Sequence, residues 1–456
     1  MPALAVAVES LSAQFTGRLL LPDHPEFDGA RRVHNGLVDR RPGVIAQCRG
    51  AADIADAIAL ARTQGLELSV RGGGHNVAGQ ATLDHGVMID LSSMRGVRVD
   101  AARRIAEVDG GATWREFNRE TQHVGLAATG GVISSTGVAG LTLGGGFGWL
   151  MPKYGMALDH LEAVTLVLAD GRVVRASQTD HPDLFWAVRG GGGNFGVAAS
   201  FEFRLHEVGP MVTGGMVVHP FPAATGALTF YRDLTAGDVP DEAFLVAALA
   251  HAPDGSGMKV AGLAAVHCGS LADGAAFLSQ VKTFGPPVAD MMGPMPYVAA
   301  NTMLDPSFMS GSRNYWKSHF LPALSDDAIG MLVEHFAAAP SPLCQIIIEN
   351  FHGAVTRVPI DATAYALRER GYNVLLLAQW LDAADDERAI AWCRDGYARL
   401  QSFGGPRRYV NYLDADDMTE QALGAVYGPN LPRLRQVKRA YDPDNAFRRN
   451  LNILPA

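Results

Sequence analysis

The feature that most constrains this chain is the clustering of its glycines. Three clusters fall in the first half of the 456 residues, at 72–74, 144–148 and 190–196. Glycine adopts backbone conformations that other residues avoid, and it lets backbone N–H groups approach a ligand without an intervening Cβ. An ordinary tight turn explains any single cluster equally well. The three together predict loops that hold the pyrophosphate of a dinucleotide.

The third cluster also satisfies the G-x-G-x-x-G fingerprint of nicotinamide-binding folds, through Gly191, Gly193 and Gly196. That fingerprint should follow a strand and open a helix. Here residues 183–188 precede the cluster, and the run 197–205 after it has the pattern of a strand. The context therefore argues against a nicotinamide dehydrogenase.

The first half alternates between strand and helix patterns. Ile54, Ile58 and Ala61 mark one face of a helix over 51–64, and Gly65 is suited to end it. Short apolar or alternating runs predict strands at 43–48, 66–70, 87–91, 105–108, 163–169 and 172–176, with a hairpin turn at Asp170-Gly171 between the last two.

The section from about 208 to 404 has few glycine loops, which suits an α+β domain. Its patterns predict strands at 215–218, 244–250, 343–349 and 373–380 and a helix at 327–338. Residues 208–285 indicate only a packed domain. In the tail, 431–441 predicts an amphipathic helix that Asp442-Pro443 stops.

Composition narrows the class of partner. With 48% hydrophobic and 19% charged residues, the chain resembles a soluble protein of two or three structural units. A net charge of -9 provides no positive field for nucleic acid or an anionic membrane, and no apolar run reaches the length of a membrane span. We therefore expect a small-molecule partner, with no nucleic acid and no membrane, and the sequence leaves the oligomeric state open.

The four cysteines, Cys48, Cys268, Cys344 and Cys393, lie far apart without C-x-x-C pairing. This spacing predicts neither a disulfide framework nor a metal site, and it fits a cytoplasmic protein.

His75 follows the first glycine cluster directly. A lone histidine beside glycines is usually a hydrogen-bonding loop residue. If the ligand is FAD, however, a neutral imidazole nitrogen can add to the 8α-methyl group of the flavin ring.

Three motifs, at 71–76, 137–149 and 182–196, resemble the FAD-binding domain of the vanillyl-alcohol oxidase flavoprotein family and, more narrowly, its berberine bridge enzyme-like branch. The tail segments 409–412, 441–447 and 450–453 are similar to the closing segment of that branch. The resemblance implies an α+β fold with a two-subdomain FAD-binding domain (1–207), an α+β substrate domain (208–404) and a C-terminal segment (405–456) that returns to the FAD domain and completes the active site.

The resemblance also implies FAD joined through its 8α carbon to His75. Bicovalent relatives carry a cysteine where this chain has Ile133, so we expect a single link, as in the amine-oxidising relatives. Thr136 would lie at the flavin edge where dioxygen reacts, although its hydroxyl is equally suited to bonding its own loop. The implied cofactor contacts are Arg71, Gly72, Gly73, Gly74, His75, Asn76, Gly79, Gly131, Thr136, Gly137, Gly140, Gly144, Gly145, Gly146, Gly148, Trp149, Gly193, Asn194, Gly196, Val197, Asn450 and Asn452.

On the substrate side, Tyr409, Asn411 and Tyr412 match a Y-x-N-Y segment of the family. Tyr412 is the first candidate for proton abstraction, with core packing as the alternative interpretation of each tyrosine. Alternation along a strand would place Tyr409 and Asn411 on one face and Tyr412 on the other, so that only one tyrosine could serve.

Two further positions follow from the resemblance. Gln379 stands where some relatives carry a carboxylate base, and because an amide cannot accept the proton, the base must lie elsewhere. Lys317 resembles a pocket lysine that could lower a tyrosine pKa, and a surface lysine is the alternative interpretation.

The sequence thus predicts an FAD-dependent oxidase that transfers hydride from a small alcohol, amine, sugar or natural product to the flavin, which dioxygen re-oxidises to give hydrogen peroxide. A flavin-dependent oxygenase or oxidative cyclase is the second hypothesis. A flavin-binding protein without turnover is the third, because no carboxylate base is evident.

Overall fold

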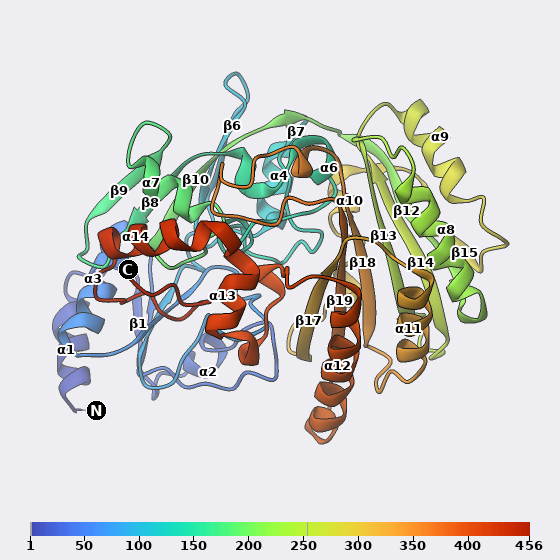
Figure 1. Cartoon of the computed structure of the whole chain (residues 1–456). Coiled ribbons are helices and arrows are strands. Elements are labelled where there is room, and N and C mark those ends of the chain that lie inside the picture. The colour runs from blue at the N-terminus through green and yellow to red at the C-terminus, as the bar shows by residue number, and fades with distance from the viewer. Residues whose placement is uncertain (1, 253) are drawn as a thin grey trace.

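The computed structural model describes residues 2–252 and 254–456 (Figure 1). Its first sheet carries the first glycine loop, which directly follows Arg71 at the end of a strand. The strand order is β1-β2-β4-β3, in which β2, β4 and β3 run parallel. The elements are β1 (Arg18–Leu20), β2 (Val44–Gln47), β3 (Leu68–Arg71) and β4 (Val87–Asp90), with helices α1 (Pro2–Ser12), α2 (Phe27–Ala30) and α3 (Ala51–Thr63). Strands β2 and β4 are buried on both faces, as is usual for parallel strands between covering layers.

The second sheet is antiparallel, with strand order β5-β6-β10-β8-β9. Its strands are β5 (Val97–Asp100), β6 (Ile105–Asp109), β8 (Leu161–Val167), β9 (Val173–Ser177) and β10 (Val197–Arg204). Around it lie α4 (Trp114–Gln122), α5 (Val138–Leu143), α6 (Met151–Tyr154), α7 (Pro182–Val188) and the pair β7 (Leu126–Ala127) and β11 (His206–Glu207). The predicted hairpin at Asp170-Gly171 is confirmed, since β8 and β9 pair there and Gly171 has a φ of 88°.

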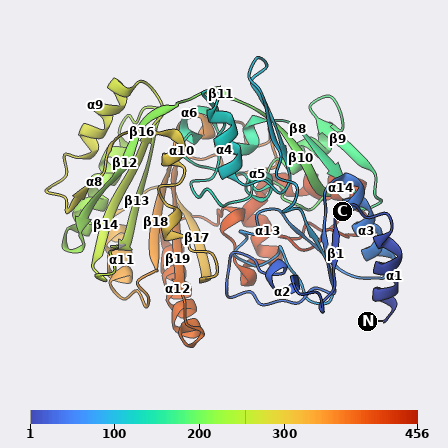
Figure 2. The ribbon, with the colours of Figure 1, turned by 180° about the vertical axis from the view of Figure 1, so that it is seen from behind.

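The third sheet is larger and antiparallel, with strand order β15-β12-β14-β13-β18-β19-β17 and with β16 beside β12. Its strands are β12 (Met211–Pro220), β13 (Ala243–His251), β14 (Lys259–His267), β15 (Ala289–Asp290), β16 (Gly293–Pro296), β17 (Arg313–Leu321), β18 (Gln345–Phe351) and β19 (Gly371–Trp380). Helices α8 (Ala224–Ala236), α9 (Leu271–Val281), α11 (Asp326–Ala337) and α12 (Asp386–Leu400) pack on its outer face, while α10 (Tyr297–Ala300) follows β16. The inner face looks toward the other two sheets (Figure 2).

After α12 the chain returns to the half of the molecule that holds its N-terminus (Figure 1). There α13 (Glu420–Tyr427) and α14 (Leu431–Tyr441) lie, and α14 packs against α7. This return brings the last residues beside the glycine loops. The divisions after residues 207 and 404 stay predictions, which the three sheets and the returning tail support.

Most predicted elements are confirmed within one to three residues, including the helices at 51–64, 327–338 and 431–441. The glycines of 190–196 follow helix α7 and lead into strand β10, which is the reverse of the nicotinamide-binding order. Over the residues that the structure describes, no helix has the length and apolar character needed to cross a membrane.

Candidate active site

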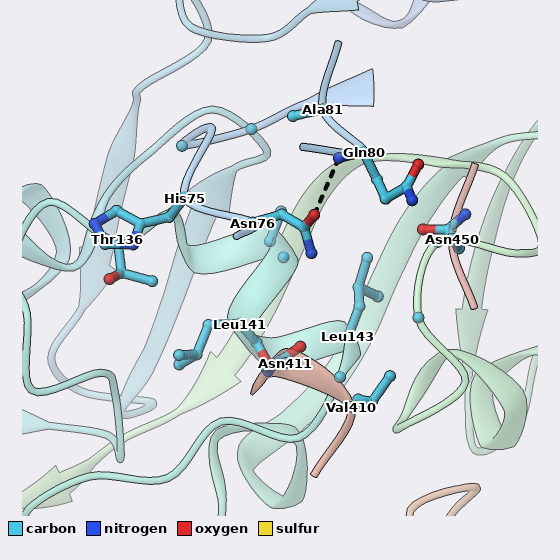
Figure 3. A pocket seen from close by; sticks show the side chains of 18 of the residues that line it. His75, Asn76, Gln80, Ala81, Thr136, Leu141, Leu143, Val410, Asn411 and Asn450 are labelled. Atoms are coloured by element: carbon cyan, nitrogen blue, oxygen red, sulfur yellow. Dashed lines mark hydrogen bonds between the residues drawn. The ribbon is translucent and has the colours of Figure 1, made fainter. Parts of the chain in front are cut away.

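One cavity runs between the glycine loops of the first two sheets and the inner face of the third. Figure 3 shows His75 and Thr136 at one end of it and Gln80 and Asn450 toward the other. Many of the predicted cofactor contacts line this cavity, namely Gly72, Gly73, Gly74, His75, Asn76, Gly131, Thr136, Gly137, Gly140, Gly144, Gly193, Asn194, Gly196, Val197 and Asn450.

The first glycine loop touches the loop that leads into helix α5, and the contact is between backbones. A Cβ added to Gly73 would lie 2.4 Å from the nitrogen of Gly137, so neither position tolerates a side chain. Within the described part of the chain, the backbone N–H groups of Gly73, Gly74 and His75 donate no backbone hydrogen bond. Such free N–H groups beside a left-handed glycine, here Gly74 with a φ of 70°, suit an anion such as a pyrophosphate.

Gly140, unlike Gly73 and Gly137, has open space beside it. It lies on the short helix α5 and lines the cavity, and a Cβ built there would meet nothing within 4 Å. A larger residue at this position would therefore project into the cavity without disturbing the fold. The open groove and the two touching loops fit an elongated dinucleotide such as FAD.

The C-terminal turn closes the cavity by docking on the second glycine loop. The Asn411 amide donates a hydrogen bond to Leu141 O over 3.0 Å, and a Cβ on Gly144 would lie 2.0 Å from Asn411 Oδ1. The Tyr409 hydroxyl accepts the N–H of Gly146 at 3.1 Å. Glycine at 144 is thus required by the returning tail.

We expected Tyr409 and Tyr412 to lie on opposite faces of a strand, and this expectation was wrong. Residues 410–412 form a 3₁₀ turn, in which the N–H of Tyr412 donates to Tyr409 O over 3.1 Å. Residues three apart on a helical turn share one side, so the two rings meet edge to face with centroids 5.0 Å apart. Both tyrosines line the cavity.

His75 presents its imidazole at the end of the cavity beside Thr136. Its Nε2 lies 3.2 Å from the hydroxyl oxygen of Ser135, and its ring stacks on that of His34. Burial, followed by the neighbouring His34, lowers the pKa of His75 to about 3. The imidazole is therefore neutral at physiological pH, with a lone pair available on one ring nitrogen.

The wall that the third sheet contributes is mainly apolar. Aromatic and aliphatic side chains from β13, β17, β18 and the loop before β17 form it, namely Phe244, Val246, Leu304, Phe308, Trp316 and Ile347. Sequence patterns in 208–285 gave no sign that β13 would border a site. Such a wall favours a largely apolar ligand, because it offers few partners for polar groups.

Glu349 is the carboxylate among the residues that line the cavity, and sequence reasoning missed its role. It accepts hydrogen bonds from the Tyr412 hydroxyl at 3.0 Å and from the Asn373 amide at 2.7 Å. Burial raises the pKa of Glu349 to about 8, against the lowering effect of these two donors. A glutamate that ends the apolar strand run 343–349 was the signal in the sequence, since an ionisable group in a buried strand needs a partner.

Asp305, in the segment before β17, fastens that segment to the loop that holds Ser134. Its carboxylate accepts the N–H of Ser134 at 2.8 Å and the Ser134 hydroxyl at 2.5 Å. Leu304 and Phe308, on the same loop, line the cavity, as does Ile133 next to Ser134. The two sides of the cavity are thereby held at a fixed separation.

Two predicted catalytic residues lie away from the cavity. Trp316 on β17 faces it, so Lys317 points to the opposite face, where it is buried against Asp416 and Asp417. It is therefore neither a pocket lysine nor a surface lysine. Gln379 lies on the inner face near the end of β19, where its amide donates to Ser312 Oγ at 2.6 Å outside the cavity.

Several predicted cofactor contacts lie outside the lining of the cavity. The Arg71 guanidinium pairs with Asp90, which is fully buried, instead of facing the cavity. Gln80 and Ala81 line the cavity in place of Gly79. The remaining positions outside the lining are Gly145, Gly146, Gly148, Trp149 and Asn452; the φ values of 131° and 83° at Gly145 and Gly146 show that these two serve the turn itself.

In the described ranges, no three His, Cys, Asp or Glu side chains converge as a metal site. The four cysteines are buried and free.

Comparison with known sequences assigns the chain to a class. Residues 42–177 match the FAD binding domain family, and residues 408–454 match the family described as berberine and berberine like. Together with the cavity and its glycine loops, these matches define an FAD-dependent oxidoreductase.

Individual relatives cover nearly the whole chain. The sequence is 32% identical to (R)-6-hydroxynicotine oxidase of Paenarthrobacter nicotinovorans over 96% of this chain and 97% of that protein. It is 30% identical to the xylooligosaccharide oxidase of Thermothelomyces thermophilus, covering 91% and 87% of the two chains. The crystal structure of 6-hydroxy-D-nicotine oxidase from Arthrobacter nicotinovorans superimposes with a TM-score of 0.87 at 29% identity, covering 97% and 99%. The chain belongs to the berberine bridge enzyme-like branch of the vanillyl-alcohol oxidase family of FAD-linked oxidases.

Proposed function

We propose that this enzyme is an oxidase that holds FAD covalently through His75 and oxidises a small, largely apolar amine. The observation that carries the proposal is the Tyr412–Glu349 hydrogen bond, which lies in an otherwise apolar wall of the cavity that His75 borders. When bound, the flavin accepts a hydride and passes two electrons to dioxygen, which leaves as hydrogen peroxide.

Two side chains that line the cavity, His75 and Ile133, support a single covalent link through histidine. The neutral His75 imidazole can act as a nucleophile, and Ile133 lines the cavity where bicovalent relatives have a cysteine. The glycines at 72–74, 137 and 140 would hold the phosphates and leave room for the ring system.

The polar pair performs the proton chemistry. The proton that leaves the substrate nitrogen passes to the Tyr412–Glu349 pair, in which Glu349 is the acceptor once it is ionised. Glu349 is held in place by the Asn373 amide, so that its second oxygen remains directed at Tyr412. Glu349 thereby supplies the carboxylate base whose absence from the sequence motifs suggested a flavin-binding protein without turnover.

The apolar wall favours an amine over an oligosaccharide. A sugar has several hydroxyl groups, and each one buried without a partner costs about 1–3 kcal/mol. Aromatic residues and one carboxylate instead match an apolar molecule with one basic nitrogen. An apolar alcohol is the second substrate class that this wall admits.

One observation supports the alternative that the enzyme is an oxygenase. Thr136, which we expect at the flavin edge where dioxygen reacts, lines the cavity beside His75 (Figure 3). Isotopically labelled dioxygen separates the two outcomes, because an oxidase places the label in peroxide and an oxygenase places it in the organic product.

The substrate assignment is tested by anaerobic bleaching of the flavin absorbance with matched panels of cyclic amines, the corresponding alcohols and short oligosaccharides. We expect bleaching by amines and peroxide formation when air is admitted. Bleaching by oligosaccharides alone would overturn the assignment.

A further inference from the structure

His34 covers one face of the His75 ring. The two imidazoles stack with centroids 3.8 Å apart and an interplanar angle of 20°. His34 is only 7% exposed and does not line the cavity, whereas His75 does. The motif around the first glycine cluster does not indicate this partner, because His34 lies 41 residues before His75 in the chain.

The backbone around His34 is fixed from two sides. Its N–H donates to Gly74 O over 3.0 Å, directly beside His75, and its carbonyl accepts the N–H of Gly311 at 2.8 Å. The next residue, Asn35, donates from its amide to Val77 O at 2.8 Å and to Asn314 O at 2.9 Å. His34 is therefore held against both the His75 loop and the start of strand β17 in the third sheet.

We propose that His34 is a positioning residue that fixes the plane of the His75 imidazole for bonding to the flavin methyl group. The inference rests on the covalent link proposed above. Formation of that link replaces one C–H bond of the methyl group and one N–H bond of the imidazole by an N–C bond, and dioxygen takes up the two protons and two electrons that are released, which gives hydrogen peroxide.

Two contacts restrict His75 in complementary ways. Ser135 Oγ, 3.2 Å from Nε2, restrains the edge of the ring, and His34 restrains its face. A ring confined in this way presents its nitrogen in one direction, so that less orientation has to be gained during bond formation. Loss of the stacking partner frees the ring to rotate about its χ2 bond.

The contact is made by the flat face of His34, which stacks on the ring of His75. Nε2 of His34 is buried and has no hydrogen-bond partner among the described residues. Burial also lowers the pKa of His34 to about 4, so the ring carries no charge at neutral pH. A phenylalanine should therefore replace it, whereas a leucine of similar volume lacks the planar face.

The test compares His34→Phe with His34→Leu in the full-length protein, prepared without flavin from riboflavin-starved cells. FAD is added in air, and the flavin that stays with acid-precipitated protein is followed in time, with circular dichroism and non-covalent FAD binding as checks of folding. We expect His34→Phe to bond flavin within about threefold of the wild-type rate and His34→Leu to be slower by about tenfold or more.

A wild-type rate in His34→Leu would overturn the proposal, and so would an equally slow rate in His34→Phe, since the ring nitrogens would then matter. Wild-type protein that releases all its flavin would overturn the covalent link itself, which distinguishes failure of the proposed function from failure of this inference.

Discussion

The Tyr412 hydroxyl donates a hydrogen bond to Glu349 Oε1 over 3.0 Å, across the junction between the C-terminal turn and strand β18. These residues are 63 positions apart in the chain. Burial and the neighbouring Glu349 raise the pKa of Tyr412, while burial raises that of Glu349 to about 8. The pair therefore holds its protons at neutral pH and releases the first of them from Glu349.

Removal of the Tyr412 hydroxyl should slow catalysis without releasing the cofactor. Tyr412→Phe keeps the ring but takes away the donor to Glu349, and we expect kcat to fall by about 10²-fold, the size of effect common for a lost proton-transfer partner. Stopped-flow measurement of flavin reduction checks this. Tyr409→Phe is the matched control, because the Tyr409 hydroxyl contacts Gly146 and Asn411 instead of Glu349; a larger effect in the control would contradict the assignment.

The pH profile of kcat/KM should report Glu349. Since its pKa is raised to about 8, the carboxyl is protonated below that pH and gains the capacity to accept a proton above it. Activity should rise through an apparent pKa near 8, and Glu349→Gln should abolish that limb as well as most of the activity. An unchanged limb in Glu349→Gln would assign the titration to another group.

Gly140 should be essential for cofactor binding and dispensable for folding. Gly140→Leu places a side chain in the cavity, where nothing else lies within 4 Å of the new Cβ. We expect a protein with a wild-type circular dichroism spectrum and no bound flavin. Gly50→Leu is the control, because a Cβ on Gly50 also meets nothing and Gly50 does not line the cavity. A yellow Gly140→Leu protein would place the FAD elsewhere.

Lys317 should matter for stability and not for chemistry. Its side chain is 5% exposed, and its ammonium group pairs with Asp416 and Asp417. Lys317→Met removes this central cation, while Arg394 stays paired with Asp416 and Arg408 with Asp417. The expected loss in free energy of unfolding is about 2 kcal/mol, the size of a lost hydrogen bond to a charged group. Lys282→Met, which breaks a pair with Asp290 in which the side chains are 33% and 38% exposed, should cost less than about 1 kcal/mol. Denaturant titration distinguishes them; equal losses would refute a special role for the buried cluster.

Sequence patterns predicted much of the fold because periodicity reports which face of an element is buried. The helix at 51–64 and the strands of the first two sheets follow from that signal. The glycine motifs predicted a shared ligand site, and residues from all three clusters line one cavity. The recognised family and the FAD-dependent oxidoreductase class are confirmed.

The errors have a common cause, which is that motif position does not give side-chain direction. Arg71 belongs to the motif but turns toward Asp90, and Lys317 lies on the opposite strand face from Trp316. Periodicity also could not show that the Tyr409 segment turns as a 3₁₀ helix when it docks on Gly144, because that conformation depends on a tertiary contact.

Glu349 and His34 escaped the sequence analysis for a related reason. Each acts through a residue far away in the chain, Tyr412 and His75 respectively. Such pairs are defined by how β18 and the 34–35 segment pack, which local patterns do not encode.

The most direct test of the account is acid precipitation of the purified protein, followed by measurement of flavin absorbance in pellet and supernatant. Wild-type protein should keep its yellow colour in the pellet, and His75→Ala should release FAD to the supernatant. Flavin that leaves the wild-type protein freely, or stays with His75→Ala, would contradict a covalent bond at His75.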